Sequence, residues 1–228
     1  MLSVFGRQAK VAIVGGGAAG LCAAIEAAKL GASVIVFDKV NKLGGNSAKA
    51  SSGINGCETV VQKERLVSDS LEMFEGDTIR VGGGKNHDLE LVSKLAEKSS
   101  DAINFLKDEI GLPLTDLLKL GGHSATRTHR LSTHAPIGFT MMQGLAARVG
   151  ALSNIEVRTS ANVTGLTYSD EAGARLVTGL TVQCEGEVAG STQTITVPAD
   201  AVIITAGGSA FDQSADGLMV RPCATVWT

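Results

Sequence analysis

The chain has 228 residues, of which 44% are hydrophobic and 28 are glycine, and its 20 basic and 23 acidic residues give a net charge of −3. This composition is typical of a globular chain and excludes a fibrous or disordered one, and a chain of this length can bury enough surface to fold without disulfides or a structural metal. The slightly acidic balance lacks the basic field on which nonspecific nucleic-acid binding depends, so we expect no nucleic-acid partner.

The first elements in chain order predict a strand, a helix and a second strand. Residues 10–14 are a short β-branched run typical of a strand buried on both faces. Residues 18–30 carry apolar side chains at helical spacing, and Gly31 follows where helices often end in a left-handed residue. With a strand over residues 33–38, this is a βαβ unit, whose strands are parallel and whose crossover is right-handed.

Helical periodicity dominates residues 57–150, which we predict to be a mainly helical insertion. The clearest helices cover residues 66–79 and 88–110, and a third covers 139–149. The second follows Asn86-His87-Asp88, which supplies N-cap chemistry.

The last part of the chain predicts strands. Four of them, at residues 155–158, 163–168, 176–184 and 192–197, are separated by turn-prone segments. We expect them to form a small antiparallel meander over residues 155–198, before a final buried strand at 201–205. The predicted fold class is α/β, a Rossmann-like domain over residues 1–208 with a parallel central sheet, the helical insertion and the meander.

A glycine motif lies between the first strand and the first helix. Residues 15–20 fit G-x-G-x-x-G: Gly15 permits the tight turn, Gly17 lets the backbone approach a pyrophosphate, and Gly20 lets helix and strand pack closely. The helix N-terminus would hold the anion, and Asp38, at the end of the next strand, would accept hydrogen bonds from an adenosine ribose. The motif predicts a dinucleotide site without choosing between NAD and FAD, and a glycine-rich turn with no ligand is the alternative.

A second stretch rich in glycine and hydroxyl groups follows Asp38. Residues 42–47 and 51–56 offer backbone N–H groups and short polar side chains that could contact the ribityl chain and flavin of FAD. An exposed flexible linker is the alternative interpretation.

Several separated motifs resemble one family. Residues 44–47, 51–56, 120–124 with 127–130, and 136–142 are similar, in order and spacing, to the soluble fumarate reductase flavoproteins of the succinate dehydrogenase/fumarate reductase flavoprotein family. The similarity extends to about residue 212. It implies an FAD-binding domain, and noncovalently held FAD, because the branches that attach flavin covalently have a histidine near the Gly-Gly motif where this chain has Asn46 and Ser47.

The resemblance also implies which residues meet FAD. Ala19 and Gly20 would contact the pyrophosphate, Asp38 the ribose, and the backbone of Val163 the adenine. Ala206 and Gly207 match the end of a returning strand, although the family more often reads Ala-Thr-Gly-Gly there. The full expected set is Gly15, Gly17, Ala19, Gly20, Asp38, Lys39, Gly45, Asn46, Ser47, Ser52, Gly53, Val163, Ala206 and Gly207.

A group of cations lies between these motifs. His123, Arg127, His129 and Arg130 could bind a dicarboxylate through bidentate guanidinium contacts, or they could be solvated loop cations. A zinc site from His123, His129 and His134 lacks helical ligand spacing and thiolate partners, so we expect no metal. Residues 82–85 are not a phosphate-binding P-loop, because Asn86 stands where the motif needs Ser or Thr.

The resemblance implies the reduction of fumarate to succinate by hydride transfer from reduced flavin, with a small dicarboxylate as the partner and the electron donor left open. In that family the substrate-clamping and proton-donating groups belong to a capping domain and a final segment that follow the returning strand. We therefore expect no catalytic residue here, and a truncated tail over residues 209–228. A non-catalytic FAD-binding remnant, an aspartate oxidase and a ketosteroid dehydrogenase are the alternatives.

Two further features bear on the compartment. The four cysteines are scattered and form no C-x-x-C pair, which favours a reducing compartment, the cytoplasm or an organelle matrix. The uncharged run at residues 11–25 is shorter than the roughly 20 apolar residues that span a bilayer and contains four glycines, so we expect neither a membrane span nor a signal peptide.

Overall fold

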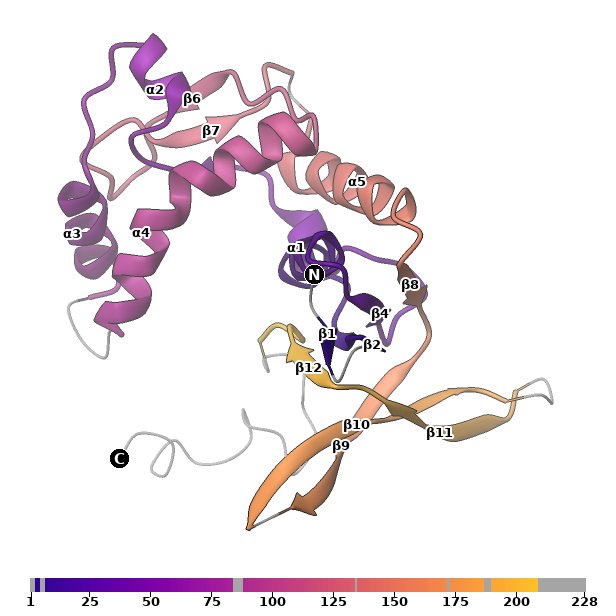
Figure 1. Cartoon of the computed structure of the whole chain (residues 1–228). Helices are drawn as coiled ribbons and strands as arrows, with labels where there is room; N and C mark the ends of the chain where they lie inside the picture. The colour runs from indigo at the N-terminus through magenta and orange to yellow at the C-terminus, as the bar shows by residue number, and fades with distance from the viewer. Residues whose placement is uncertain are drawn as a thin grey trace. The chain divides into compact units, whose positions relative to one another are not determined.

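The computed structural model describes residues 3–4, 7–83, 88–133, 135–171, 173–186 and 190–208. These residues form two compact units: Met1–Lys42 together with the chain from Asn154 onward, and Leu43–Ser153. Figure 1 labels most of their helices and strands. The predicted tail at residues 209–228 lies outside the described residues.

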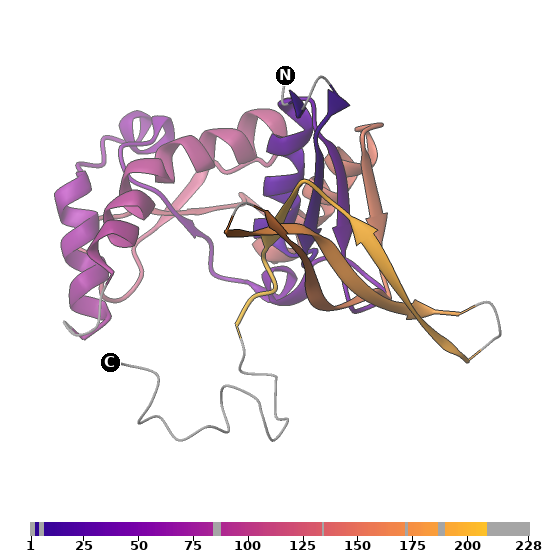
Figure 2. The same cartoon turned by 60° about the horizontal axis from the view of Figure 1, so that its bottom comes forward.

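The first unit contains a parallel four-stranded sheet. Its strands, in their order in the sheet, are β12 (Ala201–Ile204), β3 (Lys10–Val14), β4 (Ser33–Phe37) and β8 (Ile155–Arg158). Helix α1 (Ala18–Lys29) connects β3 to β4 and packs on the sheet, as Figure 2 shows. Gly31, at φ +91°, ends the helix in the left-handed conformation that the sequence predicts. The βαβ unit is thus present with nearly the predicted bounds.

Strand β8 corrects the sequence prediction. Residues 155–158 were expected to begin the antiparallel meander, but Ile155–Arg158 pairs in parallel with β4. The side-chain amide of Asn154 explains the placement, because it donates to the carbonyl oxygens of Ala28 and Ala32 at 3.0 and 2.8 Å. These bonds tie the start of β8 to the end of α1, beside the open edge of β4.

The antiparallel meander contains three long strands. Its order is β11 (Thr192–Pro198), β10 (Ala174–Glu185) and β9 (Asn162–Glu171), and Figure 2 shows the curvature of this ribbon. Leu180 and Val182 pack against Ala12 and Phe37 of the parallel sheet, so the meander completes the core of the first unit. A short hairpin, β1 (Ser3–Val4) with β2 (Arg7–Gln8), precedes β3.

The second unit is mainly helical and also contains a small sheet. Its helices are α2 (Val60–Glu64), α3 (Leu71–Val81), α4 (Leu89–Asn104) and α5 (Ile137–Gly150), with a 3-10 helix η1 (Gly45–Lys49) and a π-helical turn η2 (Phe105–Glu109). Strands β5 (Ile54–Asn55), β7 (Thr128–Arg130) and β6 (Asp116–Leu118) form an antiparallel sheet in that order. These strands are only two or three residues long, too short for an alternating pattern to predict.

The helix predicted over residues 66–79 is wrong at its start. Leu66 has a positive φ of +55° and is 93% exposed, so the chain breaks there. Helix α3 begins after Ser70, whose hydroxyl accepts a hydrogen bond from the N–H of Met73. The predicted N-cap at Asp88 is present, since its carboxylate accepts from the N–H of Leu91, and α5 begins two residues before the predicted residue 139.

No helix among the described residues is both long and apolar enough to cross a membrane. In the same part of the chain, no three histidine, cysteine or acidic side chains gather in a way that could hold a metal ion.

Candidate cofactor-binding site

The glycine turn lies between β3 and α1, as the motif predicts. Gly15 has a φ of +109°, a conformation that favours glycine, and its N–H donates to the carbonyl oxygen of Phe37 at 2.8 Å. A Cβ at Gly20 would overlap the carbonyl oxygen of Gly15. Gly20 therefore allows the first turn of α1 to lie directly against the turn, which is the close packing that the sequence indicates.

The first turn of α1 has no acidic residue of its own and no capping side chain. Gly17 occupies the cap position. The first hydrogen bond within the helix runs from the N–H of Leu21 to the carbonyl oxygen of Gly17. The positive end of the helix dipole, with Ala19 in its first turn, is thus suited to an anion.

Asp38 lies beside this turn. Its side chain is 9% exposed, and its two carboxylate oxygens accept hydrogen bonds from the N–H groups of Gly16 at 2.8 Å and Val40 at 3.0 Å. An ionised carboxylate accepts about four hydrogen bonds, so further acceptor positions remain for ribose hydroxyls. The neighbouring Lys39 is exposed.

The end of β12 and the start of β9 lie near the glycine turn and Asp38 in the first unit. The N–H of Thr205, just past β12, donates to the carbonyl oxygen of Val14, and Ala206 and Gly207 follow, exposed. The N–H of Ala161 donates to the carbonyl oxygen of Asp38, and Val163 follows two residues later in β9. Since β9 is an edge strand of its sheet, backbone groups on its outer side are outside the ladder with β10.

These features fit an adenosine diphosphate. Gly15 and Gly20 carry no side chain at positions where a Cβ would overlap neighbouring atoms. Helix α1 begins at this turn, and the buried carboxylate of Asp38 bonds to it. All lie at the carboxyl ends of the parallel strands β3, β4 and β12, the edge at which open α/β sheets bind ligands.

The predicted flavin-side residues belong to the second unit. Gly45, Asn46 and Ser47 lie in η1, and Ser52 and Gly53 lead into β5. Helix η1 is supported by the start of α5, because the N–H of Gly138 donates to the carbonyl oxygen of Ala50 at 2.9 Å and a Cβ at Gly138 would overlap that of Ser47. The segment is therefore an ordered short helix, and not the flexible linker of the alternative interpretation.

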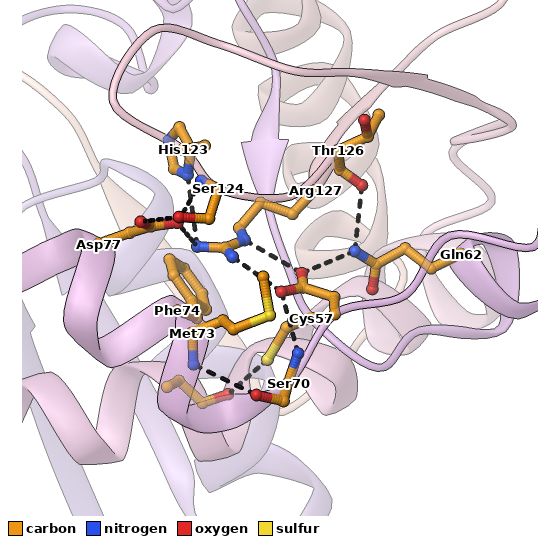
Figure 3. Close-up of polar contacts among 12 residues, drawn as sticks. Cys57, Gln62, Ser70, Met73, Phe74, Asp77, His123, Ser124, Thr126 and Arg127 are labelled. Atoms are coloured by element: carbon orange, nitrogen blue, oxygen red, sulfur yellow. Dashed lines mark hydrogen bonds and ion pairs between the residues drawn. The ribbon is translucent and has the colours of Figure 1, made fainter.

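Arg127 is not available to a substrate. Its side chain is fully buried, and all three guanidinium nitrogens donate to carboxylates, two to Asp69 at 2.7 and 3.0 Å and one to Asp77 at 2.8 Å. The guanidinium carbon also lies 4.6 Å from the centre of the Phe74 ring. Figure 3 shows this cluster, with Ser124 bonded to Asp77. The two sequence interpretations, a dicarboxylate clamp and solvated loop cations, are both wrong for Arg127.

The carboxylate of Asp77 stays ionised in this cluster. Burial alone would raise the pKa of Asp77, but the hydrogen bonds from Ser124 and Arg80 and the charge of Arg127 together lower this pKa well below its ordinary value. The side chain of Gln62 donates to Asp69 and to the carbonyl oxygen of Thr126, so it links Asp69 to the segment that precedes β7.

His129 is likewise buried and engaged. Its Nδ1 faces the carbonyl oxygen of Arg127 at 3.0 Å and therefore carries the proton, so its Nε2 accepts from the hydroxyl of Thr59 at 2.8 Å. Burial lowers the pKa of His129. With both ring nitrogens occupied, His129 is no zinc ligand, and His134 lies outside the described residues. His123 and Arg130 are half-buried.

Sequence reasoning missed the acidic partners of Arg127 and the hydroxyl of Thr205. Asp69 and Asp77 are 58 and 50 residues from Arg127, and no local spacing connects them. Thr205 carried a signal, since it precedes Ala206 where the family more often has the reverse order, but its partners are visible only in the folded turn.

Comparison with known proteins agrees with this geometry. The family model of the FAD binding domain matches residues 10–224. The chain is 44% identical over 144 residues to fumarate reductase 1 of Saccharomyces cerevisiae, covering 63% of this chain and 30% of that protein. It is 34% identical over 213 residues to fumarate reductase of Schizosaccharomyces pombe, covering 91% and 40%.

A solved structure shares the fold. The open conformation of a flavocytochrome c3 fumarate reductase superposes with a TM-score of 0.80 at 31% identity, covering 89% of this chain and 34% of that one. The likeness confirms the predicted α/β fold class with its Rossmann-like FAD-binding arrangement. The chain spans less than half the length of each of these relatives. It belongs to the FAD binding domain family, in the form found in flavoproteins of the fumarate reductase type.

Proposed function

We propose that this chain is the FAD-binding part of a flavoprotein that reduces fumarate to succinate. The observation that carries the proposal is the glycine turn at the N-terminus of α1 beside the buried carboxylate of Asp38, in a chain whose relatives are named fumarate reductases. Bound FAD would supply the hydride that reduces the alkene. The chain's own part in this reaction is to bind and orient the cofactor, and none of its residues is assigned a catalytic role.

We propose that each unit contacts a different part of FAD. In the first, backbone N–H groups at Gly17, Ala19 and Gly20 would hold the diphosphate, because the helix dipole favours negative charge there. Gly15 would shape the turn, where a Cβ is excluded. Asp38 would accept from the ribose hydroxyls, beside Lys39. The backbone of Val163 would meet the adenine, and Ala206 and Gly207 would line the returning strand end.

In the second unit, η1 and the segment before β5 would meet the flavin and ribityl groups. Gly45, Asn46, Ser47, Ser52 and Gly53 carry only short polar side chains or none, and η1 is fixed by the start of α5. No histidine occurs between residues 43 and 56. We propose that FAD is therefore held without a covalent bond.

An absorbance spectrum of the purified chain tests FAD binding. We expect the two visible bands of oxidised flavin, released into the supernatant when heat or acid denatures the protein. Flavin that stays with the precipitated protein would contradict noncovalent attachment. A chain reconstituted with excess FAD that shows no bands after gel filtration would contradict the binding site itself.

The reaction is tested on the full-length protein. We expect it to oxidise a reduced dye when fumarate is added and to form succinate stoichiometrically. A full-length protein that carries FAD but leaves fumarate unchanged would overturn the fumarate reductase assignment and would favour one of the related flavoenzymes, an aspartate oxidase or a ketosteroid dehydrogenase.

The compartment is part of the proposal. The described cysteines, Cys22, Cys57 and Cys184, are free thiols, which suits a reducing environment such as the cytoplasm or an organelle matrix. Fractionation of cells that express the full-length protein tests this assignment, and recovery with secreted proteins would contradict it.

A further inference from the structure

One peptide of the glycine turn is held at both of its ends. The carbonyl oxygen of Gly15 accepts a hydrogen bond from the hydroxyl of Thr205 at 3.0 Å, and the N–H of Gly16, across the same peptide bond, donates to the carboxylate of Asp38 at 2.8 Å. Because a peptide group is planar, two bonds at opposite ends fix the direction in which its N–H and C=O point.

This restraint matters because the turn consists of glycine. Glycine has little steric preference between backbone conformations, so the sequence Gly15-Gly16-Gly17 does not by itself choose one orientation of the peptide. A rotated peptide would turn the Gly15 carbonyl, with its partial negative charge, toward the carboxylate of Asp38 and would break the bond from the Gly16 N–H to that carboxylate. Asp38 and the turn would then lose the arrangement that places a ribose acceptor beside a diphosphate site.

The contacts of Thr205 allow it to restrain this peptide. Its N–H donates to the carbonyl oxygen of Val14 at 2.8 Å, and its hydroxyl lies 2.9 Å from that same oxygen as well as 3.0 Å from that of Gly15. A Cβ on Gly15 would come within 2.5 Å of the Thr205 carbonyl oxygen, so the end of β12 lies directly against the turn. Since Gly20 has no side chain, the hydroxyl also fits beside the first turn of α1.

We propose that Thr205 is a positioning residue of the diphosphate site: its hydroxyl holds the Gly15 carbonyl and so orients the Gly15–Gly16 peptide, whose N–H holds Asp38 beside the turn. Thr205 acts through the turn and needs no contact with the ligand. The inference rests on the proposed function, since the ligand is the diphosphate of FAD. It also accounts for the order Thr205-Ala206, because a threonine at residue 206 would place its hydroxyl one residue further along the chain.

The matched variants Thr205→Val and Thr205→Ser test the proposal. Valine keeps the shape of the side chain and removes the hydroxyl, whereas serine keeps the hydroxyl. We expect Thr205→Val to raise the dissociation constant for FAD about tenfold, the order expected when one hydrogen bond is lost, and Thr205→Ser to stay within about twofold of the original chain. The affinity for ADP, measured by calorimetric titration, should fall by a similar factor, because only the ADP half of FAD contacts the turn.

Thr167→Val is the control. The Thr167 hydroxyl pairs with that of Thr178 at 3.1 Å on the exposed meander of the same unit, so its loss should leave FAD and ADP binding unchanged. Equal affinity of Thr205→Val and the original chain would overturn the proposal. So would a loss of affinity in Thr205→Ser as large as that in Thr205→Val, since packing of the methyl group would then be the cause.

Amide hydrogen exchange separates this inference from the proposed function. We expect Thr205→Val to speed exchange at the Gly16 amide while the amide of Ile13, buried in β3, keeps its protection. Equal acceleration at both amides would indicate general destabilisation and overturn the positioning role. If the original chain binds neither FAD nor ADP, the proposed function fails, yet the exchange at Gly16 still decides whether Thr205 orients the turn.

Discussion

The second unit contains a buried cluster of charged side chains around Arg127. Arg127 contributes one positive charge between the two carboxylates of Asp69 and Asp77, and every guanidinium nitrogen is engaged. A buried ion of this kind is stable only with its partners, because desolvation of an unpaired charge costs several kcal/mol. The same residue type in a loop motif would be a ligand-binding group, and burial alone distinguishes the two roles.

Removal of the Arg127 charge should destabilise the chain severely. Arg127→Met removes the cation that lies against both carboxylates and leaves Asp77 with Arg80 alone, and we expect the free energy of unfolding in urea to fall by about 3–5 kcal/mol. Lys94→Met, which breaks an exposed pair with Glu97 on α4, should change it by less than about 1 kcal/mol. Similar values for the two variants would show that the buried cluster is not a structural centre.

Gly20 should tolerate no side chain. A Cβ there overlaps the backbone carbonyl of Gly15, which cannot move without disturbing the turn, so Gly20→Ala should abolish FAD retention on gel filtration. Gly76, also in a helix, has no atom within 4 Å of its Cβ position. Gly76→Ala should therefore keep FAD binding and stabilise α3 by about 0.5–1 kcal/mol. Retained FAD in Gly20→Ala would contradict the close packing of α1 on the turn.

At the scale of elements, one network joins α2 to β7. Thr59 caps α2 with its hydroxyl, which accepts from the N–H of Gln62 and donates to Nε2 of His129 in β7. The Gln62 side chain returns to the N–H of Thr59, completing a capping box. A helix of only five residues is thereby fixed by its cap and by a strand 70 residues away.

Stability should depend on the protonation of His129. Because burial lowers its pKa, the folded chain keeps this ring neutral at pH values where the unfolded chain, with an ordinary histidine pKa near 6.5, takes up a proton. The free energy of unfolding should therefore fall as the pH is lowered from about 7.5 to 5.5.

Urea titrations across this pH range measure the effect. His129→Asn should be less stable at neutral pH but should show a shallower dependence on pH. His123, whose pKa burial also lowers, contributes with the same sign, so His123→Asn serves as the comparison and should keep most of the slope if His129 is the main source. An unchanged slope in His129→Asn would contradict the neutral, buried state of this ring.

At the scale of the whole molecule, a ligand that binds only the folded chain must stabilise it. FAD should raise the midpoint of thermal unfolding with increasing concentration, corresponding to about 2.7 kcal/mol at 100 times its dissociation constant. FMN, which lacks the adenosine and one of the two phosphates, should raise this midpoint much less, because Asp38 would have no ribose of adenosine to bind. Equal stabilisation by FAD and FMN would show that the chain recognises only the part that the two cofactors share.

The sequence by itself determined the βαβ unit, the glycine turn and the acidic residue after the second strand, because these depend on local periodicity and on residues without side chains. It also predicted the start of α4 with its Asp88 cap, although the helix expected to reach residue 110 becomes π-helical at Phe105, and it predicted the start of α5 to within two residues. The family resemblance followed from the same short motifs and was confirmed by the comparisons.

Only the tertiary structure decided the partners of residues far apart in the chain. Ile155–Arg158 reads as a strand in isolation, and Asn154, bonded to the end of α1, assigns it to the parallel sheet. Arg127 reads as a surface cation until Asp69 and Asp77 enclose it, and Thr205 acquires a role only where β12 returns beside Gly15. Burial and long-range hydrogen bonds have no local signature, because they depend on which segments the folded chain brings together.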